Sequence, residues 1–91
     1  MRSALELVKE LVAFDTTSRS SNLSLIEFVQ ELLKGARLRL TYNAGKTKAN
    51  LFASFGPDAP GGYVLSGHTD VVPVDGQEWS SDPFAPEMRE G

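Results

Sequence analysis

The organisation of this chain is clearest from residues 63–73, which read Tyr63-Val64-Leu65-Ser66-Gly67-His68-Thr69-Asp70-Val71-Val72-Pro73. The apolar run at the start of this stretch shows no polar alternation, which is typical of an inner strand covered on both faces. His68 is the only histidine of the chain, and Asp70 follows it by two positions. Side chains two apart in an extended backbone point the same way, so the sequence predicts that His68 and Asp70 share one face at the end of the strand.

His68 and Asp70 have the chemistry of a metal ligand and its supporting carboxylate. A ligating imidazole usually donates its second ring N–H to a carboxylate or a carbonyl, which fixes the tautomer and the orientation of the ring. A zinc site needs several ligands, however, so one histidine cannot form a site by itself. Taken as isolated residues, His68 is more often a partly buried histidine with one hydrogen bond, and Asp70 is more often a turn residue that caps a nearby N–H.

The wider sequence resembles a known family. Residues 67–73 and 79–84 are similar to the first metal-binding motif of the aminoacylase and carboxypeptidase-like family of co-catalytic zinc hydrolases. Residues 11–18, 48–53 and 74–77 also resemble that family, most closely its bacterial deacetylases. The resemblance covers essentially the whole chain. A bare His-x-Asp would carry little weight, whereas a string of this length is specific.

The resemblance implies that residues 1–91 are the N-terminal portion of a metallohydrolase catalytic domain, incomplete on its own. The family takes its further ligands from later sequence. They are an Asp that bridges two zinc ions in a Gly-Arg-Gly-x-x-Asp-Met-Lys-Gly motif, a Glu-Glu pair that gives the general base and a ligand, another acidic ligand and a distant histidine. By this resemblance His68 is a zinc ligand and Asp70 holds and polarises its imidazole in a catalytic role. The chain alone is expected to be inactive.

The implied reaction is hydrolysis of the amide bond of a small-molecule N-acetylated amino acid, with zinc or cobalt as cofactor. A metal-bridging water of lowered pKa attacks the carbonyl while a glutamate accepts its proton. Relatives that act on succinyl-diaminopimelate or on dipeptides share the His-x-Asp core, so the substrate stays open. One imidazole holds zinc weakly, and we expect this chain to bind none stably. The alternative is a non-catalytic module that folds and self-associates, for example as a homodimer, through exposed strand edges or apolar surface.

Composition and charge exclude several other classes. The chain has 91 residues, no cysteine and a formal net charge of −3. Without cysteine there is no disulfide and no thiolate-bound zinc, and the scattered basic residues form no face for nucleic acid. The apolar runs are far too short to span a bilayer, and no secretory pattern opens the chain. We therefore expect no nucleic-acid or membrane partner and a cytoplasmic location.

The periodicity of the remaining sequence predicts an α/β fold, in which two N-terminal helices pack on a small mixed sheet of about three strands. Ser3-Ala4-Leu5-Glu6 has the form of a capping box and begins the first helix. Residues 15–18 end this helix; they include hydroxyl groups that could suggest a nucleophile, but no second histidine exists to activate one. The second helix is expected over residues 22–34, with Gly35 as its terminator.

Three strands are expected to follow these helices. Strict alternation predicts a half-buried strand at residues 37–42, with Leu38, Leu40 and Tyr42 on one face. The next strand, at residues 50–55, is expected to run antiparallel to it across a turn. The third is the apolar segment that precedes His68.

Other side chains near the motif are interpreted more modestly. Asp75, Glu78 and Asp82 are in a loop and are expected to be solvated turn residues rather than ligands. Trp79 and Phe84 are expected to anchor the metal loop by packing beneath it, with stacking on substrate as the less favoured role.

Overall fold

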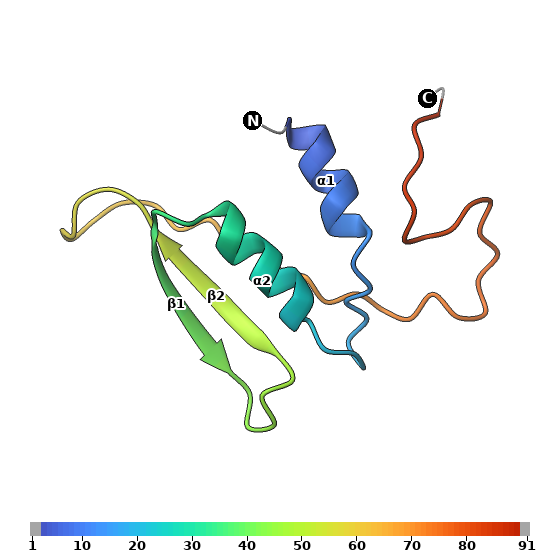
Figure 1. The fold of residues 1–91 in the computed structure, drawn as a ribbon, viewed down its shortest axis with the longest axis horizontal. Coiled ribbons are helices and arrows are strands. Elements are labelled where there is room, and N and C mark those ends of the chain that lie inside the picture. The colour runs from blue at the N-terminus through green and yellow to red at the C-terminus, as the bar shows by residue number, and fades with distance from the viewer. Residues whose placement is uncertain (1–2, 90–91) are drawn as a thin grey trace.

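The computed structural model describes residues 3–89, in which two helices precede one β-hairpin (Figure 1). Helix α1 spans Ala4–Val12 and helix α2 spans Leu23–Leu32. Strands β1 (Arg37–Tyr42) and β2 (Ala49–Ser54) form a two-stranded antiparallel sheet. The predicted α/β fold is confirmed, with one strand fewer than expected. Neither α1 nor α2 has the length and apolar composition that crossing a bilayer requires.

Helix α1 begins as its sequence predicts. Ser3 is the N-cap, and its hydroxyl accepts a hydrogen bond of 3.2 Å from the N–H of Glu6, which satisfies one of the free N–H groups of the first turn. Much of the apolar stripe is uncovered, since Leu5 and Val8 are about half exposed. Leu11, near the C-terminal end, packs against the core. This end of α1 therefore joins the helix to the rest of the fold.

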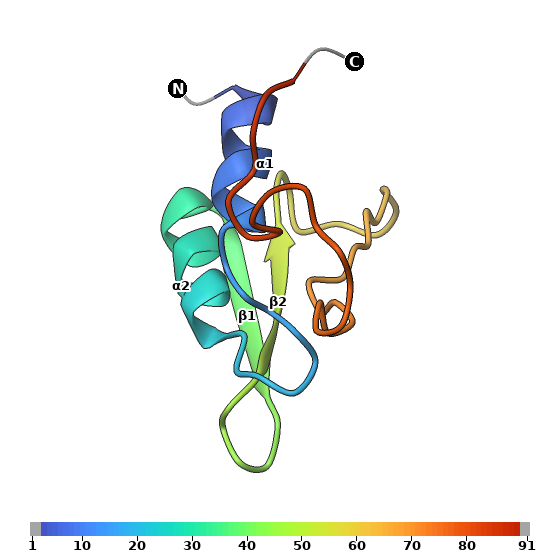
Figure 2. The ribbon, with the colours of Figure 1, turned by 90° about the vertical axis from the view of Figure 1, so that its right-hand side faces the viewer.

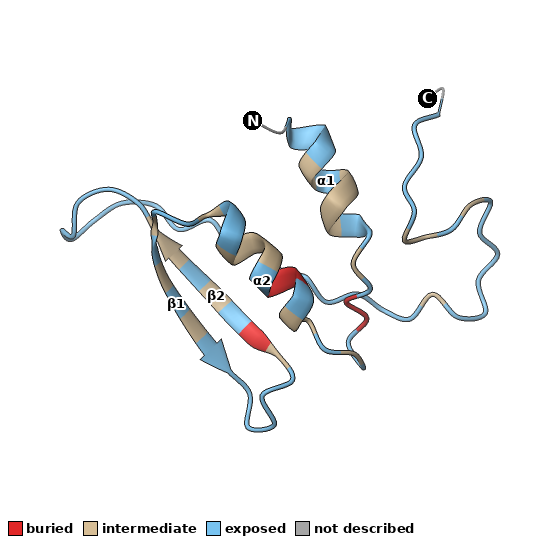
Figure 3. Ribbon diagram, in the orientation of Figure 1, coloured by how far each residue is buried: buried red, intermediate tan, exposed pale blue. Residues whose placement is uncertain are grey.

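Helix α2 supplies most of the core. Leu25 and Ile26 are buried and pack with Ala49 of β2 (Figure 3). Partly buried apolar side chains surround this cluster: Leu11, Phe14, Leu23, Val29, Leu40 and Leu51. Figure 2 shows α2 on one side of the hairpin, in contact with β2. Gly35 follows α2 with a φ of 103°, a left-handed conformation that favours glycine, as expected of a helix terminator.

The hairpin has the predicted antiparallel pairing. Leu40 lies opposite Leu51 and Tyr42 opposite Ala49. Leu38 and Leu40 are half-buried as expected, whereas Tyr42, at the last position of β1 beside the exposed turn, is 50% exposed. The apolar face of β1 is therefore covered at Leu38 and Leu40 and open at Tyr42.

The predicted third strand does not form among the described residues. Residues 63–66 have no strand assignment, and Tyr63 and Leu65 are almost completely exposed. A strand needs a neighbour that takes up its N–H and C=O groups, and residues 3–89 bring none to this segment. The sheet is consequently antiparallel rather than mixed. The apolar composition shows which environment the segment suits, but no neighbour among residues 3–89 provides that environment.

Asn22 connects the start of α2 to β2. Its Nδ2 donates to the carbonyl oxygen of Ala49 and its Oδ1 accepts from the N–H of the same residue, both at 2.9 Å. Ala49 is only 4% exposed, so water has little access to these backbone groups. The side-chain amide of Asn22 thus makes the two backbone hydrogen bonds that a neighbouring strand would otherwise make with Ala49.

Replacing Asn22 with alanine is expected to lower the free energy of unfolding by about 1–3 kcal/mol, because a buried N–H and C=O lose their partners. Urea unfolding followed by circular dichroism measures the loss. Asn50→Ala makes the same chemical change at an exposed neighbouring position of β2 and is expected to alter stability by no more than about 0.5 kcal/mol. Equal losses in the two variants would contradict the bridging role of Asn22.

Candidate metal-binding site around His68

His68 and Asp70 lie in contact in the extended segment that follows the hairpin. His68 Nδ1 is 3.1 Å from Asp70 Oδ1 and 3.1 Å from the Asp70 carbonyl oxygen. Both oxygens are acceptors, so Nδ1 carries the hydrogen and the lone pair of the neutral ring is on Nε2. The side chains are 84% and 63% exposed, respectively. The structure thus brings the two residues together as the spacing predicts, although without the strand that was expected to precede them.

Residues 16–18 run beside residues 69–71 in a short parallel pairing. The N–H of Val71 donates to the carbonyl of Thr16 at 3.3 Å, and the N–H of Ser18 donates to the carbonyl of Val71 at 3.0 Å. The Thr16 hydroxyl adds a bond of 2.5 Å to the carbonyl of Thr69. The segment after α1 therefore holds the backbone on both sides of Asp70.

The carboxylate of Asp70 has a separate partner for each oxygen. The Ser18 hydroxyl donates to Oδ2 at 2.9 Å, while Oδ1 faces His68. The hydrogen bond from Ser18 is the largest effect on the pKa of Asp70 and lowers it below its ordinary value. Desolvation opposes this shift, and the weaker contact with His68 lowers the pKa further. Asp70 is thus stabilised in the ionised form that an imidazole N–H requires as an acceptor.

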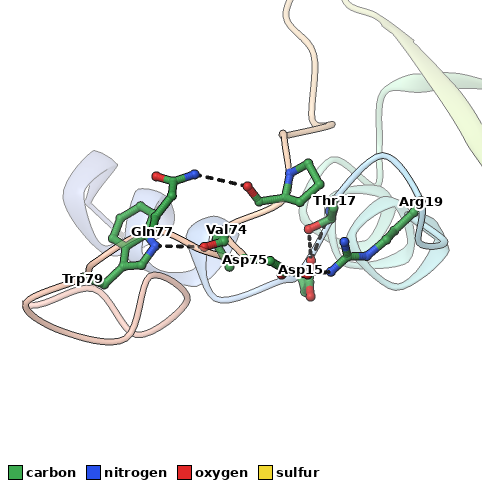
Figure 4. Close-up of polar contacts among 8 residues, drawn as sticks. Asp15, Thr17, Arg19, Val74, Asp75, Gln77 and Trp79 are labelled. Atoms are coloured by element: carbon green, nitrogen blue, oxygen red, sulfur yellow. Dashed lines mark hydrogen bonds and ion pairs between the residues drawn. The ribbon is translucent and has the colours of Figure 1, made fainter.

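Asp15 and Thr17 stabilise the turn that carries this pairing (Figure 4). Asp15 Oδ1 accepts from the Thr17 hydroxyl at 2.5 Å and from the Thr17 N–H at 3.1 Å. These bonds lower the pKa of Asp15. Thr17 is only 2% exposed, so the bond from its hydroxyl satisfies a buried polar group.

Two cationic side chains hold the same turn from outside. Arg19 Nη2 is 3.1 Å and 3.2 Å from the two carboxylate oxygens of Asp75 (Figure 4), and Lys48 Nζ donates to the carbonyl of Ser18. Both members of the Arg19–Asp75 pair are exposed, so water screens the attraction and its contribution to stability is small. The pair instead fixes where the two loops meet.

An apolar cavity of about 430 Å³ lies beside His68. The end of α1 and the segment after Pro73 line most of it, including Leu11, Phe14, Trp79 and Phe84. Trp79 Nε1 donates to the carbonyl of Val74 at 3.3 Å, which keeps the ring against this segment (Figure 4). Trp79 and Phe84 therefore line the same cavity as His68, and their role as anchors of its loop stays a prediction.

The acidic loop residues do not join His68. Asp75 pairs with Arg19, Asp82 accepts from the N–H of Phe84 at 2.9 Å, and Glu78 is exposed. Within residues 3–89, no group of three or more His, Cys, Asp or Glu side chains could hold a metal ion. The donor set present fits one corner of a metal centre: an imidazole with its supporting carboxylate, which needs further ligands.

Sequence reasoning missed the role of residues 16–18, which were interpreted only as the end of a helix. They also form the neighbouring backbone of the His68 segment and supply the hydroxyl on Asp70. Three residues are too few to show a period, so no pattern reveals the pairing. The available signal was the resemblance of residues 11–18 to the family. It indicates that the segment matters, but not which residues it contacts.

Comparisons with known proteins relate the whole chain to two named enzymes. It is 34% identical, over 94 residues, to acetylornithine deacetylase of Pasteurella multocida, matching 100% of this chain and 24% of the relative. It is 39% identical, over 93 residues, to succinyl-diaminopimelate desuccinylase of Methylococcus capsulatus, with the same coverage. A stretch of 43 residues is 58% identical to the desuccinylase of Stenotrophomonas maltophilia, covering 46% of this chain and 11% of the relative. The chain spans about a quarter of the length of the full-coverage relatives.

No family model and no solved structure matches the chain. The named relatives nevertheless indicate a class, the hydrolases of the metallopeptidase type. More particularly, the whole chain is similar to enzymes of the M20 peptidase family. These relatives do not separate acetylornithine deacetylase from succinyl-diaminopimelate desuccinylase, so the narrower resemblance to deacetylases does not follow from them.

Proposed function

We propose that this chain forms the N-terminal part of the catalytic domain of a metal-dependent amidohydrolase. One observation carries the proposal: the Nδ1 of His68 lies 3.1 Å from two acceptor oxygens of Asp70, a contact that favours the tautomer with the Nε2 lone pair open to a metal ion. The similarity of the whole chain to a deacetylase and a desuccinylase supports it. The family resemblance requires further ligands and a glutamate base, and the Glu-Glu pair that it implies is not among residues 1–91.

Each residue of this chain has a defined task in the proposed site. His68 binds one metal ion through Nε2, and Asp70 keeps the Nδ1 proton in place and the ring oriented. A bound zinc or cobalt ion supplies Lewis-acid chemistry, by activating water and polarising the carbonyl of the substrate. The backbone of residues 16–18 holds the Asp70 segment. The chain alone is inactive because it lacks the general base.

The substrate we propose is N2-acetyl-L-ornithine, whose deacetylation releases acetate and ornithine for arginine synthesis, a cytoplasmic pathway. The resemblance of residues 11–18, 48–53 and 74–77 to bacterial deacetylases supports this choice, as does the Pasteurella relative. Succinyl-diaminopimelate is the second candidate, favoured by the 58% identity over 43 residues to a desuccinylase. Both are small N-acylated amino acids.

The test uses the complete protein encoded by the gene that contains this sequence. We expect it to release ornithine from N2-acetyl-L-ornithine, to lose activity with a chelator and to regain it with zinc or cobalt. N-succinyl-LL-diaminopimelate, assayed in parallel, decides between the two substrates. The 91-residue chain with added zinc serves as the negative control. Chelator-sensitive turnover by this chain alone, or an open reading frame that stops directly after residue 91, would contradict the proposal.

The second function is a non-catalytic module that self-associates. Its support is the nearly complete exposure of Tyr63 and Leu65, since apolar strand-forming segments tend to pair with other chains. Light scattering at several concentrations of the 91-residue chain distinguishes the two functions. A rise in mass together with a stop codon after residue 91 supports the module, and a monomer at all concentrations rules it out.

A further inference from the structure

We propose that Ser18 is a positioning residue, which fixes the orientation of the Asp70 carboxylate and, through it, the tautomer of the His68 ring. Three side chains form a continuous series of contacts: Ser18 Oγ to Asp70 Oδ2 at 2.9 Å, and Asp70 Oδ1 to His68 Nδ1 at 3.1 Å. The purpose of this arrangement rests on the proposed function, because a defined tautomer matters for metal binding. The geometry itself does not depend on that function.

Ser18 is well placed to hold another side chain because its own backbone is fixed. Its N–H donates to the carbonyl of Val71 at 3.0 Å, and its carbonyl accepts from Lys48 Nζ. The preceding residue, Thr17, is the most buried polar residue described. A hydroxyl on a backbone that is held in this way is a preorganised donor, so little conformational freedom is lost when it binds Asp70.

Asp70, by contrast, has little else to orient it. Its side chain is 63% exposed, and the terminal torsion of an aspartate is broad rather than confined to one narrow well. Without Ser18, the carboxylate is free to turn toward solvent. The Ser18 hydroxyl also lies 3.4 Å from the carbonyl of Val71, but the shorter contact with the charged carboxylate is the stronger hydrogen bond.

The orientation of Asp70 in turn biases where His68 carries its proton, because the charged carboxylate oxygen adds to the Asp70 carbonyl oxygen, which also lies 3.1 Å from Nδ1. The ring is 84% exposed, so packing does not hold it. Its two neutral tautomers differ in whether Nδ1 or Nε2 is the donor. An Asp70 oxygen held beside Nδ1 favours the Nδ1–H form, which leaves Nε2 able to bind a metal ion. Loss of Ser18 should therefore shift His68 toward the Nε2–H form.

Nitrogen-15 NMR of the 91-residue chain measures this directly, because the chain contains a single histidine. The ring shifts are recorded at alkaline pH, because the comparison concerns the two neutral tautomers of the ring. We expect Nδ1–H to predominate in the wild type. Ser18→Ala should raise the ratio of Nε2–H to Nδ1–H by about threefold or more, the effect of one lost hydrogen bond.

Matched variants separate positioning from general disturbance. Ser18→Thr keeps the hydroxyl and should restore the wild-type ratio. Ser20→Ala makes the same change two residues away, at a side chain with no recorded hydrogen bond in the described chain, and should leave the ratio unaltered. If Ser18→Ala loses the backbone pairing, seen as loss of protection of the Val71 amide, Ser18→Cys replaces it, since a thiol of similar size is a weak donor. An unchanged ratio in Ser18→Ala or Ser18→Cys overturns the proposal.

The tautomer ratio is measured without metal and without turnover, so its outcome does not depend on whether the proposed function is correct. An inactive complete protein whose Ser18→Ala variant still shifts the tautomer refutes the function and leaves the positioning role intact. An active complete protein whose Ser18→Ala variant keeps the wild-type tautomer ratio supports the function and refutes the positioning role. In an active enzyme, Ser18→Ala should lower kcat/KM by less than Asp70→Asn does, within the roughly 10–100-fold range for partners of a metal ligand.

Discussion

Replacing His68 with alanine is expected to lower the kcat/KM of the complete protein for its acylated amino acid by at least about 100-fold, the upper end of the cost of losing a ligand's supporting partner. Removing the ligand itself should lower kcat/KM by at least as much as removing its supporting partner. No other imidazole exists in residues 1–91 to take its place. Steady-state kinetics with added zinc, together with the metal content of the purified variant by mass spectrometry, measures both consequences.

Glu78→Gln is the matched control for this experiment. Glu78 is a potential oxygen ligand in the loop that follows the motif, and it is exposed. Because it has no contact with His68, its substitution should leave both kcat/KM and metal content close to those of the wild type. If the His68→Ala enzyme keeps its metal and its activity, His68 is not a metal ligand.

The elements with local signals could be predicted from the sequence. The N-cap at Ser3, the strand at residues 37–42 and the glycine after α2 each depend on residues within a few positions of one another, and each is found in the structure. The contact between His68 and Asp70 belongs to the same group, because a spacing of two needs only an extended backbone.

The contacts across the chain could not be predicted in this way. The bond from Ser18 to Asp70 joins residues 52 positions apart, and the pairing around it involves too few residues to set a register by hydrophobic pattern. The prediction of a strand at residues 63–66 was wrong for a related reason. The composition of this segment expresses a preference for burial, but burial depends on partners that the sequence of the segment cannot specify.

The other large effect is on stability. Leu25→Ala is expected to lower the free energy of unfolding by about 2–5 kcal/mol, because the side chain is 4% exposed and its removal leaves a cavity between α2 and β2. Only Leu25, Ile26 and Ala49 form the buried apolar core of the described residues. The loss is therefore a large fraction of the roughly 5–15 kcal/mol that stabilises a typical domain. Urea unfolding followed by circular dichroism gives the value.

Leu32→Ala provides the comparison, since it makes the same substitution in the same helix and changes helix propensity equally. Leu32 is 38% exposed, so less apolar area is lost from the interior, and we expect a change of about 1 kcal/mol or less. The difference between the two variants isolates the packing of Leu25 against β2. If both variants lose the same stability, α2 does not bury Leu25 against the hairpin, and the core that joins the helices to the sheet is not the one described.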